Sequence, residues 1–276
     1  QMCADHDRQS GEGVGPQEYT LIKLQVVDLN TPSLEKLKGK NVFLVAATLR
    51  PETMYGQTNC FILPGANYGI FAMKNDEFFI CSERSAKNMA YQGLTKEDEI
   101  VEKVGSIGGD ELMGARLKAP ISPFEFVYAL PMLGISMNKG TGVVTSVPSD
   151  APDDFAALRD LKKKPAFREK YGITEEMVGP FDPIEIINIP GYGNLAAIKA
   201  CDDFKVTSQN DKEALLKAKD DVYLKGFYEG VMLVGSCKGK KVSEAKTIVR
   251  GELISQGLAS PYFEPESLVV SRSGNE

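Results

Sequence analysis

The sequence predicts an α+β protein, in which short strands form a β-barrel-like core that helices decorate. Short apolar or alternating segments separated by Pro and Gly dominate the N-terminal half of the chain. Segments with helical periodicity are fewer and gather mainly in the C-terminal half. Many short strands in irregular order with a few helices are typical of the α+β class.

Seven segments are expected to be strands. Residues 19–27 alternate apolar and polar side chains, as in a strand with one buried face, whereas residues 41–47 form a continuous apolar run. Such a run is typical of a strand buried on both faces. The other strands are expected at residues 59–63, 70–73, 78–81, 126–130 and 143–147.

Four helices are expected, at residues 82–92, 152–164, 211–223 and 242–256. The first is followed by Gly93 and the last by Gly257, and glycine is the common residue just after a helix. The second begins after Ser149-Asp150 and carries Pro152 in its first turn, which is a strong start signal.

The chain is expected to be one domain of 276 residues that has been cut from a longer polypeptide. Residues 1–18 are rich in Gly, Gln and Asp and are expected to be a linker. The chain begins at Gln1 rather than Met and ends in the polar residues 271–276. Residues 154–246 are more charged than the rest, which indicates either a solvated helical face or an inserted subdomain that meets RNA or a partner.

The composition excludes several kinds of chemistry. The five cysteines are scattered without a C-x-x-C pair, which favours a reducing, cytosolic setting over disulfides or zinc. The single histidine, His6, lies in a polar segment, so catalytic Ser-His-Asp or Cys-His groups are not expected. No apolar run reaches the roughly 20 residues that span a bilayer. The net charge of -6 argues against non-specific nucleic-acid binding but permits a domain that handles only an RNA end.

The first segment with chemical potential covers residues 47–58, directly after the most apolar strand. It holds three threonines, Arg50 and a turn that Pro51 fixes, at a place where rigid scaffolds often present functional groups. Hydroxyls there can hold water or a substrate, and a guanidinium can bind phosphate or carboxylate. The alternative is a structural turn in which Thr48 and Thr53 bond to the local backbone.

The second segment covers residues 140–155, where a strand runs into a helix with Asp150, Asp153 and Asp154 at its start. The free amide groups and dipole of a helix N-terminus favour ionised carboxylates. We therefore expect these aspartates to be charged, weak bases suited to holding a cation, with helix capping as the structural alternative. Gly140-x-Gly142 lacks the third glycine of a dinucleotide fingerprint and precedes a strand.

Together the two segments resemble the signatures of the editing domains inserted in leucyl-, isoleucyl- and valyl-tRNA synthetases. Residues 48–53 are similar to the threonine-rich motif of that family, and residues 140–154 to its GTG strand with the following aspartate-bearing helix. Residues 145–150, 226–230 and 271–274 are similar to the eukaryotic cytosolic leucyl variant. The resemblance spans essentially the whole chain and makes residues from about 155 to 250 eukaryote-type helical insertions.

The resemblance implies post-transfer editing, as part of a leucine-tRNA ligase in the cytoplasm. In this reaction the ester between a wrong amino acid (isoleucine, methionine or norvaline) and the terminal adenosine of tRNA(Leu) is hydrolysed. The implied partners are that 3′ end and the rest of the synthetase, with no membrane, and the isolated domain is expected to be a monomer. No cofactor is expected here, because ATP and magnesium serve the synthetic part of such enzymes.

The resemblance also implies residue roles. Asp154 matches the aspartate that holds the substrate's α-ammonium group, and Thr48 the threonine near the ester and its attacking water. Arg50 matches the arginine that supports the site, and Thr53 the threonine that blocks leucine. The remaining candidates are expected to bind substrate: Leu49, Tyr55, Thr145, Val147, Ser149 and Asp150.

Four positions depart from bacterial members of the family. Leu49 stands where many of them have a second threonine, and Thr145 where they often have methionine. Asp150-Ala151 stands where they have His-Asp, so a bacterial role does not transfer to these side chains. Two other functions remain open at this stage: a non-catalytic tRNA-end or protein-docking module, and a free-standing esterase or amidase. The missing nucleophile–histidine pair counts against the latter.

Overall fold

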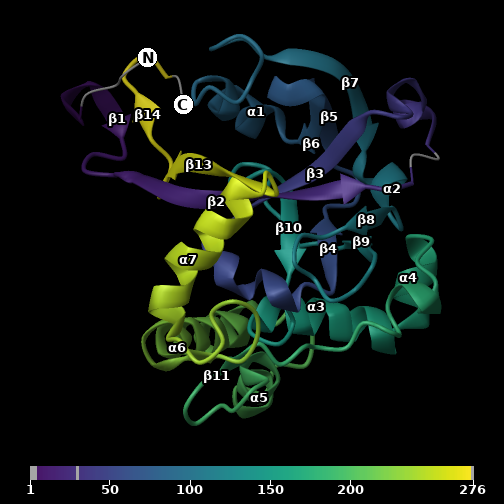
Figure 1. Ribbon diagram of the computed structural model, residues 1–276, viewed down its shortest axis with the longest axis vertical. Coiled ribbons are helices and arrows are strands. Elements are labelled where there is room, and N and C mark those ends of the chain that lie inside the picture. The colour runs from purple at the N-terminus through teal and green to yellow at the C-terminus, as the bar shows by residue number, and fades with distance from the viewer. Residues whose placement is uncertain (1–4, 29–30, 275–276) are drawn as a thin grey trace.

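The computed structural model, which describes residues 5–28 and 31–274, contains a large mixed sheet with helices grouped mainly at one end of it (Figure 1). The α+β class is therefore confirmed. Ten strands form the sheet, in the order β10-β4-β9-β8-β2-β3-β6-β5-β7, with β13 paired to β2 beside this path. Their bounds are β2 (Pro16–Val26), β3 (Asn41–Thr48), β4 (Asn59–Ile62), β5 (Asn67–Ala72), β6 (Glu77–Cys81), β7 (Glu102–Gly108), β8 (Arg116–Lys118), β9 (Val127–Pro131), β10 (Val143–Ser146) and β13 (Ala259–Pro265).

The sheet is curled rather than closed. Most neighbouring strands are antiparallel, whereas β3 pairs with β6 and β4 with β9 in parallel. The end strand β10 lies close to β3, so the sheet bends back on itself. Within residues 5–28 and 31–274 the pairing does not close into a barrel, so only the curled shape of the predicted barrel is present.

All four predicted helices are present, and the helix predicted at residues 211–223 extends to Glu229. The helices are α1 (Glu83–Ala90), α2 (Gly109–Leu112), α3 (Pro152–Lys163), α4 (Pro165–Lys170), α5 (Ala196–Asp203), α6 (Lys212–Glu229) and α7 (Val242–Ser255). Helices α3, α5 and α6 pack against one another at one end of the molecule, and α7 leads from there to β13 (Figure 1).

The strand β2 is buried on both faces, whereas a single buried face was expected. Leu24 belongs to the main hydrophobic core, and Leu21 to a second core on the opposite face of the sheet. The polar position Lys23 is also buried, and an ion pair of 2.8 Å with Glu77 offsets the cost of burying its ammonium group. The neighbouring strand β3 is buried on both faces, as its apolar run predicts.

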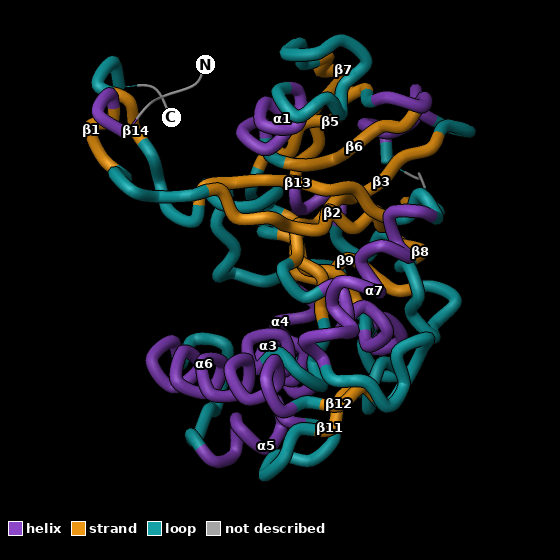
Figure 2. The backbone as a smooth tube through the Cα atoms, turned by 60° about the vertical axis from the view of Figure 1, so that its left-hand side comes forward, coloured by secondary structure: helices purple, strands orange, loops and turns teal. Residues whose placement is uncertain are grey.

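The N-terminal segment is more structured than a linker. Residues 16–18, predicted to lie in the linker, form the start of β2 and pair with β13. The short strand β1 (Arg8–Ser10) pairs with β14 (Val270–Ser271), and this small ladder stands apart from the main body (Figure 2). A second ladder joins β11 (Ile187–Asn188) to β12 (Val231–Met232).

The described part of the chain contains four of the five cysteines and the single histidine. Four cysteines are buried free thiols (Cys60, Cys81, Cys201 and Cys237), while Cys3 lies outside the described residues. His6 is exposed, as expected. Among the helices described, none has the length and apolar character that a membrane span requires.

Candidate active site

The threonine-rich segment forms a tight turn at the end of β3. A 3-10 helix, η3 (Pro51–Gly56), begins with Pro51, whose fixed φ and missing N–H suit the first position of a helix. The backbone N–H of Arg50 donates to Thr48 Oγ1 at 3.0 Å, and Thr53 Oγ1 donates to the Arg50 carbonyl at 2.8 Å. Both hydroxyls thus stabilise the turn, as the structural alternative proposes. However, the Thr48 hydroxyl acts there only as an acceptor, so its own hydrogen is left for another group.

The aspartate segment forms the link between β10 and α3. The N-cap residue of α3 is Ala151, and no side chain caps the helix, so neither Ser149 nor Asp150 serves as the expected cap. Instead Asp154 Oδ2 accepts the backbone N–H of Val147 at 2.8 Å. Asp154 Oδ1 makes no hydrogen bond to any of the described residues. One oxygen therefore fixes the side chain and the other is available to a ligand.

The two segments face one cavity of about 740 Å³. This volume lies within the range of about 300–1,000 Å³ that small-molecule sites occupy. The GTG turn (residues 140–142) and Tyr19 complete the wall on the side of the sheet. Seven of the ten predicted site residues line this cavity: Thr48, Leu49, Arg50, Thr53, Thr145, Val147 and Asp154.

The other three predicted site residues do not line the cavity. The ring of Tyr55 packs against Gly235, where a Cβ would lie 2.2 Å from Tyr55 Cζ. Ser149 and Asp150 are fully buried, and the Ser149 hydroxyl donates to Asp150 Oδ2 at 2.7 Å. The geometry therefore gives these three side chains no direct access to a substrate in the cavity.

Arg50 is held from three sides. Its Nε lies 3.5 Å from Glu52 Oε1, and its Nη1 donates to the Asp150 carbonyl at 3.4 Å. The guanidinium also lies over the ring of Tyr223, with Cζ 4.4 Å from the centroid, as in a cation–π contact. Because these contacts fix the guanidinium, Arg50 can support the turn that carries Thr48 and Thr53.

The electrostatic environment of Asp154 differs from the sequence-based expectation. Burial raises the pKa of its carboxyl to about 7, and the nearby Asp153 adds to the effect. The Val147 N–H, Lys219 and Arg50 act in the opposite direction but do not cancel it. The expectation that the helix N-terminus keeps this group fully ionised was therefore wrong, because desolvation outweighs the helix amides. Burial also raises the pKa of Asp150 to about 6.

One wall of the cavity was not predicted. Helix α6 contributes Lys212, Lys219 and Tyr223, which share one face of the helix because they are spaced by seven and four residues. The sequence of this charged stretch indicates either a solvated helical face or an inserted subdomain that meets RNA or a partner. The lysines and the tyrosine at helical spacing were the available signal, but nothing local indicated that this face meets the turn after β3.

Lys219 interacts with both aspartates at the start of α3, Asp153 and Asp154. Its ammonium group lies 3.2 Å from Asp153 Oδ2, and its positive charge also favours the ionised form of Asp154. Asp153 is thereby paired within the protein, which leaves Asp154 as the carboxylate for a cationic ligand. Within the described part of the chain, no three His, Cys, Asp or Glu side chains are arranged to hold a metal ion.

Known proteins show the same fold and related sequences. A scan against protein-family models finds no match. The chain is 56% identical over 276 residues to the cytoplasmic leucine–tRNA ligase of Pongo abelii and 54% identical over 278 residues to that of Dictyostelium discoideum. Both matches cover the whole chain, but only 24% and 26% of those proteins. The chain thus spans about a quarter of the length of these relatives.

Solved structures match the chain over nearly their full length. A crystal structure of GlLeuRS-CP1 has a TM-score of 0.83 and 38% identity, with coverage of 90% of this chain and 100% of that one. The cytosolic leucyl-tRNA synthetase editing domain of P. knowlesi has a TM-score of 0.82 and 30% identity, with coverage of 92% and 99%. The predicted resemblance is confirmed, and the chain belongs to the editing-domain family of cytosolic leucyl-tRNA synthetases.

Proposed function

We propose that the chain hydrolyses the ester between a noncognate amino acid and the terminal adenosine of tRNA(Leu), as the editing part of a leucine-tRNA ligase. The observation that carries this proposal is the shared cavity, in which Asp154 faces the same space as Thr48 and Thr53. An amino acid ester needs a partner for its ammonium group, a positioned water and a limit on side-chain size. These three residues supply one requirement each.

Asp154 is proposed to hold the α-ammonium group. Its side chain is 7% exposed and one oxygen is tied to the Val147 N–H, so the other oxygen has a fixed position. A buried carboxylate binds a cation more strongly than an exposed one, because water screens the pair less. The raised pKa has a further consequence: a bound ammonium lowers it and draws the carboxyl into its ionised form.

Thr48 is proposed to orient the attacking water or the ester carbonyl. Its oxygen accepts the Arg50 N–H, which leaves the hydroxyl hydrogen and one lone pair for the reacting groups. The water oxygen forms a bond to the carbonyl carbon, and the bond from that carbon to the ribose oxygen then breaks. A proton from the water passes to the ribose oxygen, through a second water or the neighbouring ribose hydroxyl. Because the ester is already activated, positioning supplies much of the acceleration.

Thr53 is proposed to exclude leucine. Its hydroxyl is bonded to the Arg50 carbonyl and the residue is 3% exposed, so it forms a fixed part of the wall. A pocket separates side chains that differ by one methylene or branch by only ~1–3 kcal/mol, which is why related synthetases edit. Forcing extra atoms against a rigid wall costs a similar ~1–3 kcal/mol. A fixed threonine can therefore favour other aliphatic side chains over leucine.

The proposed partners are the 3′ end of tRNA(Leu) and the remainder of the synthetase, and the proposed reaction uses no cofactor in this domain. A deacylation assay tests the function, with isoleucyl-tRNA(Leu) and the isoleucyl ester of adenosine as substrates. The wild-type chain should hydrolyse the adenosine ester, and Asp154→Ala should lose nearly all of this activity while remaining folded. Binding of the RNA without hydrolysis of either ester would instead indicate a docking module. Equal hydrolysis of an ester that lacks the amino group would indicate a general esterase.

A further inference from the structure

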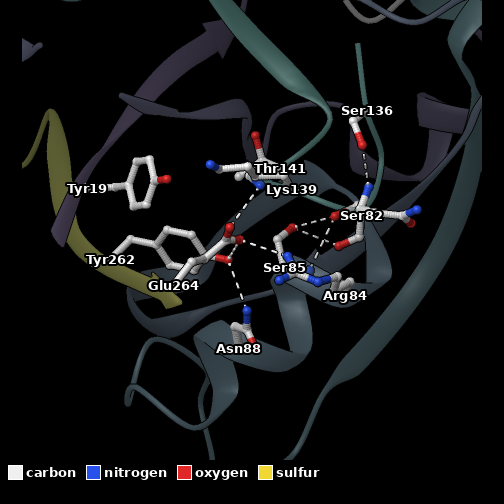
Figure 3. A network of polar contacts seen from close by, with 12 residues as sticks. Tyr19, Ser82, Arg84, Ser85, Asn88, Ser136, Lys139, Thr141, Tyr262 and Glu264 are labelled. Atoms are coloured by element: carbon white, nitrogen blue, oxygen red, sulfur yellow. Dashed lines mark hydrogen bonds and ion pairs between the residues drawn. The ribbon is translucent and has the colours of Figure 1, made fainter. Parts of the chain in front are cut away.

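A buried carboxylate on the last long strand contacts the wall of the cavity. Glu264 in β13 is 1% exposed, although it lies close to the end of the strand. Figure 3 shows its side chain directed toward the segment around Lys139 and Thr141, between Tyr262 and Arg84. None of the reacting groups proposed above contacts Glu264, so its burial calls for a separate explanation.

Three donors surround the Glu264 carboxylate. The backbone N–H of Gly140 donates to Oε2 at 2.9 Å, and Arg84 Nη1 lies 3.0 Å from Oε1. The hydroxyl of the fully buried Tyr262 also donates to Oε1, and Asn88 Nδ2 lies 3.4 Å from that hydroxyl (Figure 3). Arg84 and Asn88 belong to α1, so this carboxylate joins β13, α1 and the GTG turn.

The GTG turn has a conformation that needs support. Gly140 and Gly142 have φ values of +65° and +79°, in the left-handed region that favours glycine. The Ser82 N–H donates to the Thr141 carbonyl at 2.8 Å, and the Tyr68 hydroxyl to the Gly142 carbonyl at 2.6 Å. These two contacts hold the middle and end of the turn. Glu264 provides the contact at its start.

Burial of a charged side chain such as Glu264 lowers the stability of the fold. The penalty for burying a carboxylate is offset only when hydrogen-bond donors and an opposite charge surround the group. Hydrogen bonds to a charged acceptor are about twice as strong as neutral ones. A buried, paired carboxylate therefore fixes the Gly140 N–H more rigidly than a neutral acceptor would. Lys139 Nζ also lies 3.4 Å from the backbone carbonyl of Glu266, a contact that does not involve the Glu266 carboxylate.

We propose that Glu264 is a positioning residue for the cavity: it fixes the GTG turn, and through it the wall that faces Thr48 and Leu49. The inference rests on the proposed function, because it concerns the placement of the same aminoacyl-adenosine. Glu264 itself does not reach the cavity, whereas Lys139, Gly140, Thr141 and Gly142 all line it. Strand β13 thus supports a site whose lining residues lie between Tyr19 and Tyr223.

The test compares Glu264→Ala, Glu264→Gln and the control Glu266→Ala, which removes an exposed charge just beyond the end of the same strand. Two quantities are measured well below the Tm of every variant: the Kd of a non-hydrolysable isoleucyl-amide analogue of the adenosine ester, and the kcat for the ester. Glu264→Ala should weaken binding about tenfold, because the Gly140 N–H loses its charged acceptor and the turn must then be ordered when the analogue binds. Tenfold in Kd corresponds to about 1.4 kcal/mol, close to the contribution of one hydrogen bond to a charged group. Glu264→Gln should recover part of the loss, because its amide oxygen can still accept the Gly140 N–H.

The Gly140 amide provides an independent measurement. In the wild-type chain its proton should exchange slowly with solvent, and Glu264→Gln should speed the exchange without a matching change at Val147. Unchanged binding and kcat in folded Glu264 variants would overturn the inference, as would an equal loss in Glu266→Ala or fast exchange at Gly140 in the wild type. If Glu264→Ala does not fold, the Kd, the kcat and the Gly140 exchange rate of Glu264→Gln test the inference. If the wild type neither binds the analogue nor hydrolyses the ester, the proposed function fails instead.

Discussion

Replacement of Asp154 by asparagine should stabilise the fold at alkaline pH and abolish editing. The folded carboxyl has a raised pKa, so the folded chain holds a proton at this site that the unfolded chain has already released. The stability of the folded state therefore falls as the pH rises. The contribution of Asp154 is fully present below about pH 4 and is lost progressively until the pH has risen through about 7. Asparagine is neutral at every pH and escapes the loss.

The size of the effect follows from the two pKa values. Between pH 5 and pH 8 the unfolded group is almost fully ionised, while the folded group changes from protonated to ionised at a pKa of about 7. At 1.36 kcal/mol per pKa unit, the stability difference between variant and wild type should widen by about 2–3 kcal/mol over this interval. The side chain is only 7% exposed, so solvent screening does little to reduce the figure. In a domain of this size the widening corresponds to roughly 5–10 °C in Tm.

Urea unfolding at pH 5 and pH 8 measures the difference for the wild type, Asp154→Asn and a control, Asp182→Asn. Asp182 is 84% exposed and solvent screens its ion pair of 2.7 Å with Lys162, so its replacement should change the difference with pH only slightly. Asparagine keeps an oxygen that can accept the Val147 N–H, so the local turn should survive. A constant or narrowing difference for Asp154→Asn would refute the assignment of a buried, proton-binding carboxyl. Retained editing by the same variant would refute the ammonium role.

Three further predictions concern the cavity wall. Thr48→Val should lower kcat for the adenosine ester about tenfold or more with little change in analogue Kd, because it removes a hydrogen-bonding group near the reacting atoms; a loss confined to Kd would contradict this. Thr53→Ala should allow hydrolysis of leucyl-tRNA(Leu), measured by deacylation, and continued protection of leucine would place the gate elsewhere. Lys219→Met should raise the pKa of Asp154 further, because a nearby positive charge is lost. The pH profile of analogue binding should then shift to higher pH, and an unshifted profile would show that Lys219 does not act on Asp154.

The elements that sequence analysis predicted are those with strong local patterns. The apolar run of β3 and the start of α3 at Pro152, after Ser149-Asp150, could be recognised without knowledge of their neighbours. Strand β7 was missed because five of its seven residues are polar or glycine and most of them remain exposed, so no apolar alternation appears. Strand β13 carries Pro261 and Pro265, which usually argue against a strand.

The residues of the candidate site also fall into two groups, those that a local sequence pattern indicates and those that only tertiary packing brings to the site. Thr48, Thr53 and Asp154 lie in two short segments whose residue types indicate chemistry, and the structure brings them to one cavity. Tyr223 lines the cavity and Glu264 contacts the GTG turn in its wall, both from distant parts of the chain, and only tertiary packing determines these contacts. The pKa of Asp154 could not be foreseen either. A helix N-terminus is visible in a sequence, whereas the extent of burial around one carboxyl is not.

The buried polar residues around Arg50 fix the position of its guanidinium beside the site. Arg50 Nη2, Glu52 Oε2 and Asp150 Oδ1 are buried and have no hydrogen-bond partner among the described residues. Buried polar atoms without a partner lower the stability of the fold, and replacement of a buried ion pair by apolar side chains of similar volume is often neutral or stabilising. The guanidinium, however, must stay fixed under the loop that carries Thr48 and Thr53, and the Asp150 carbonyl and Glu52 set its position. The charged side chains of Arg50, Glu52 and Asp150, with their buried polar atoms, together with the buried Asp154 and Glu264, thus lower the stability of the fold around the cavity where the substrate is proposed to bind.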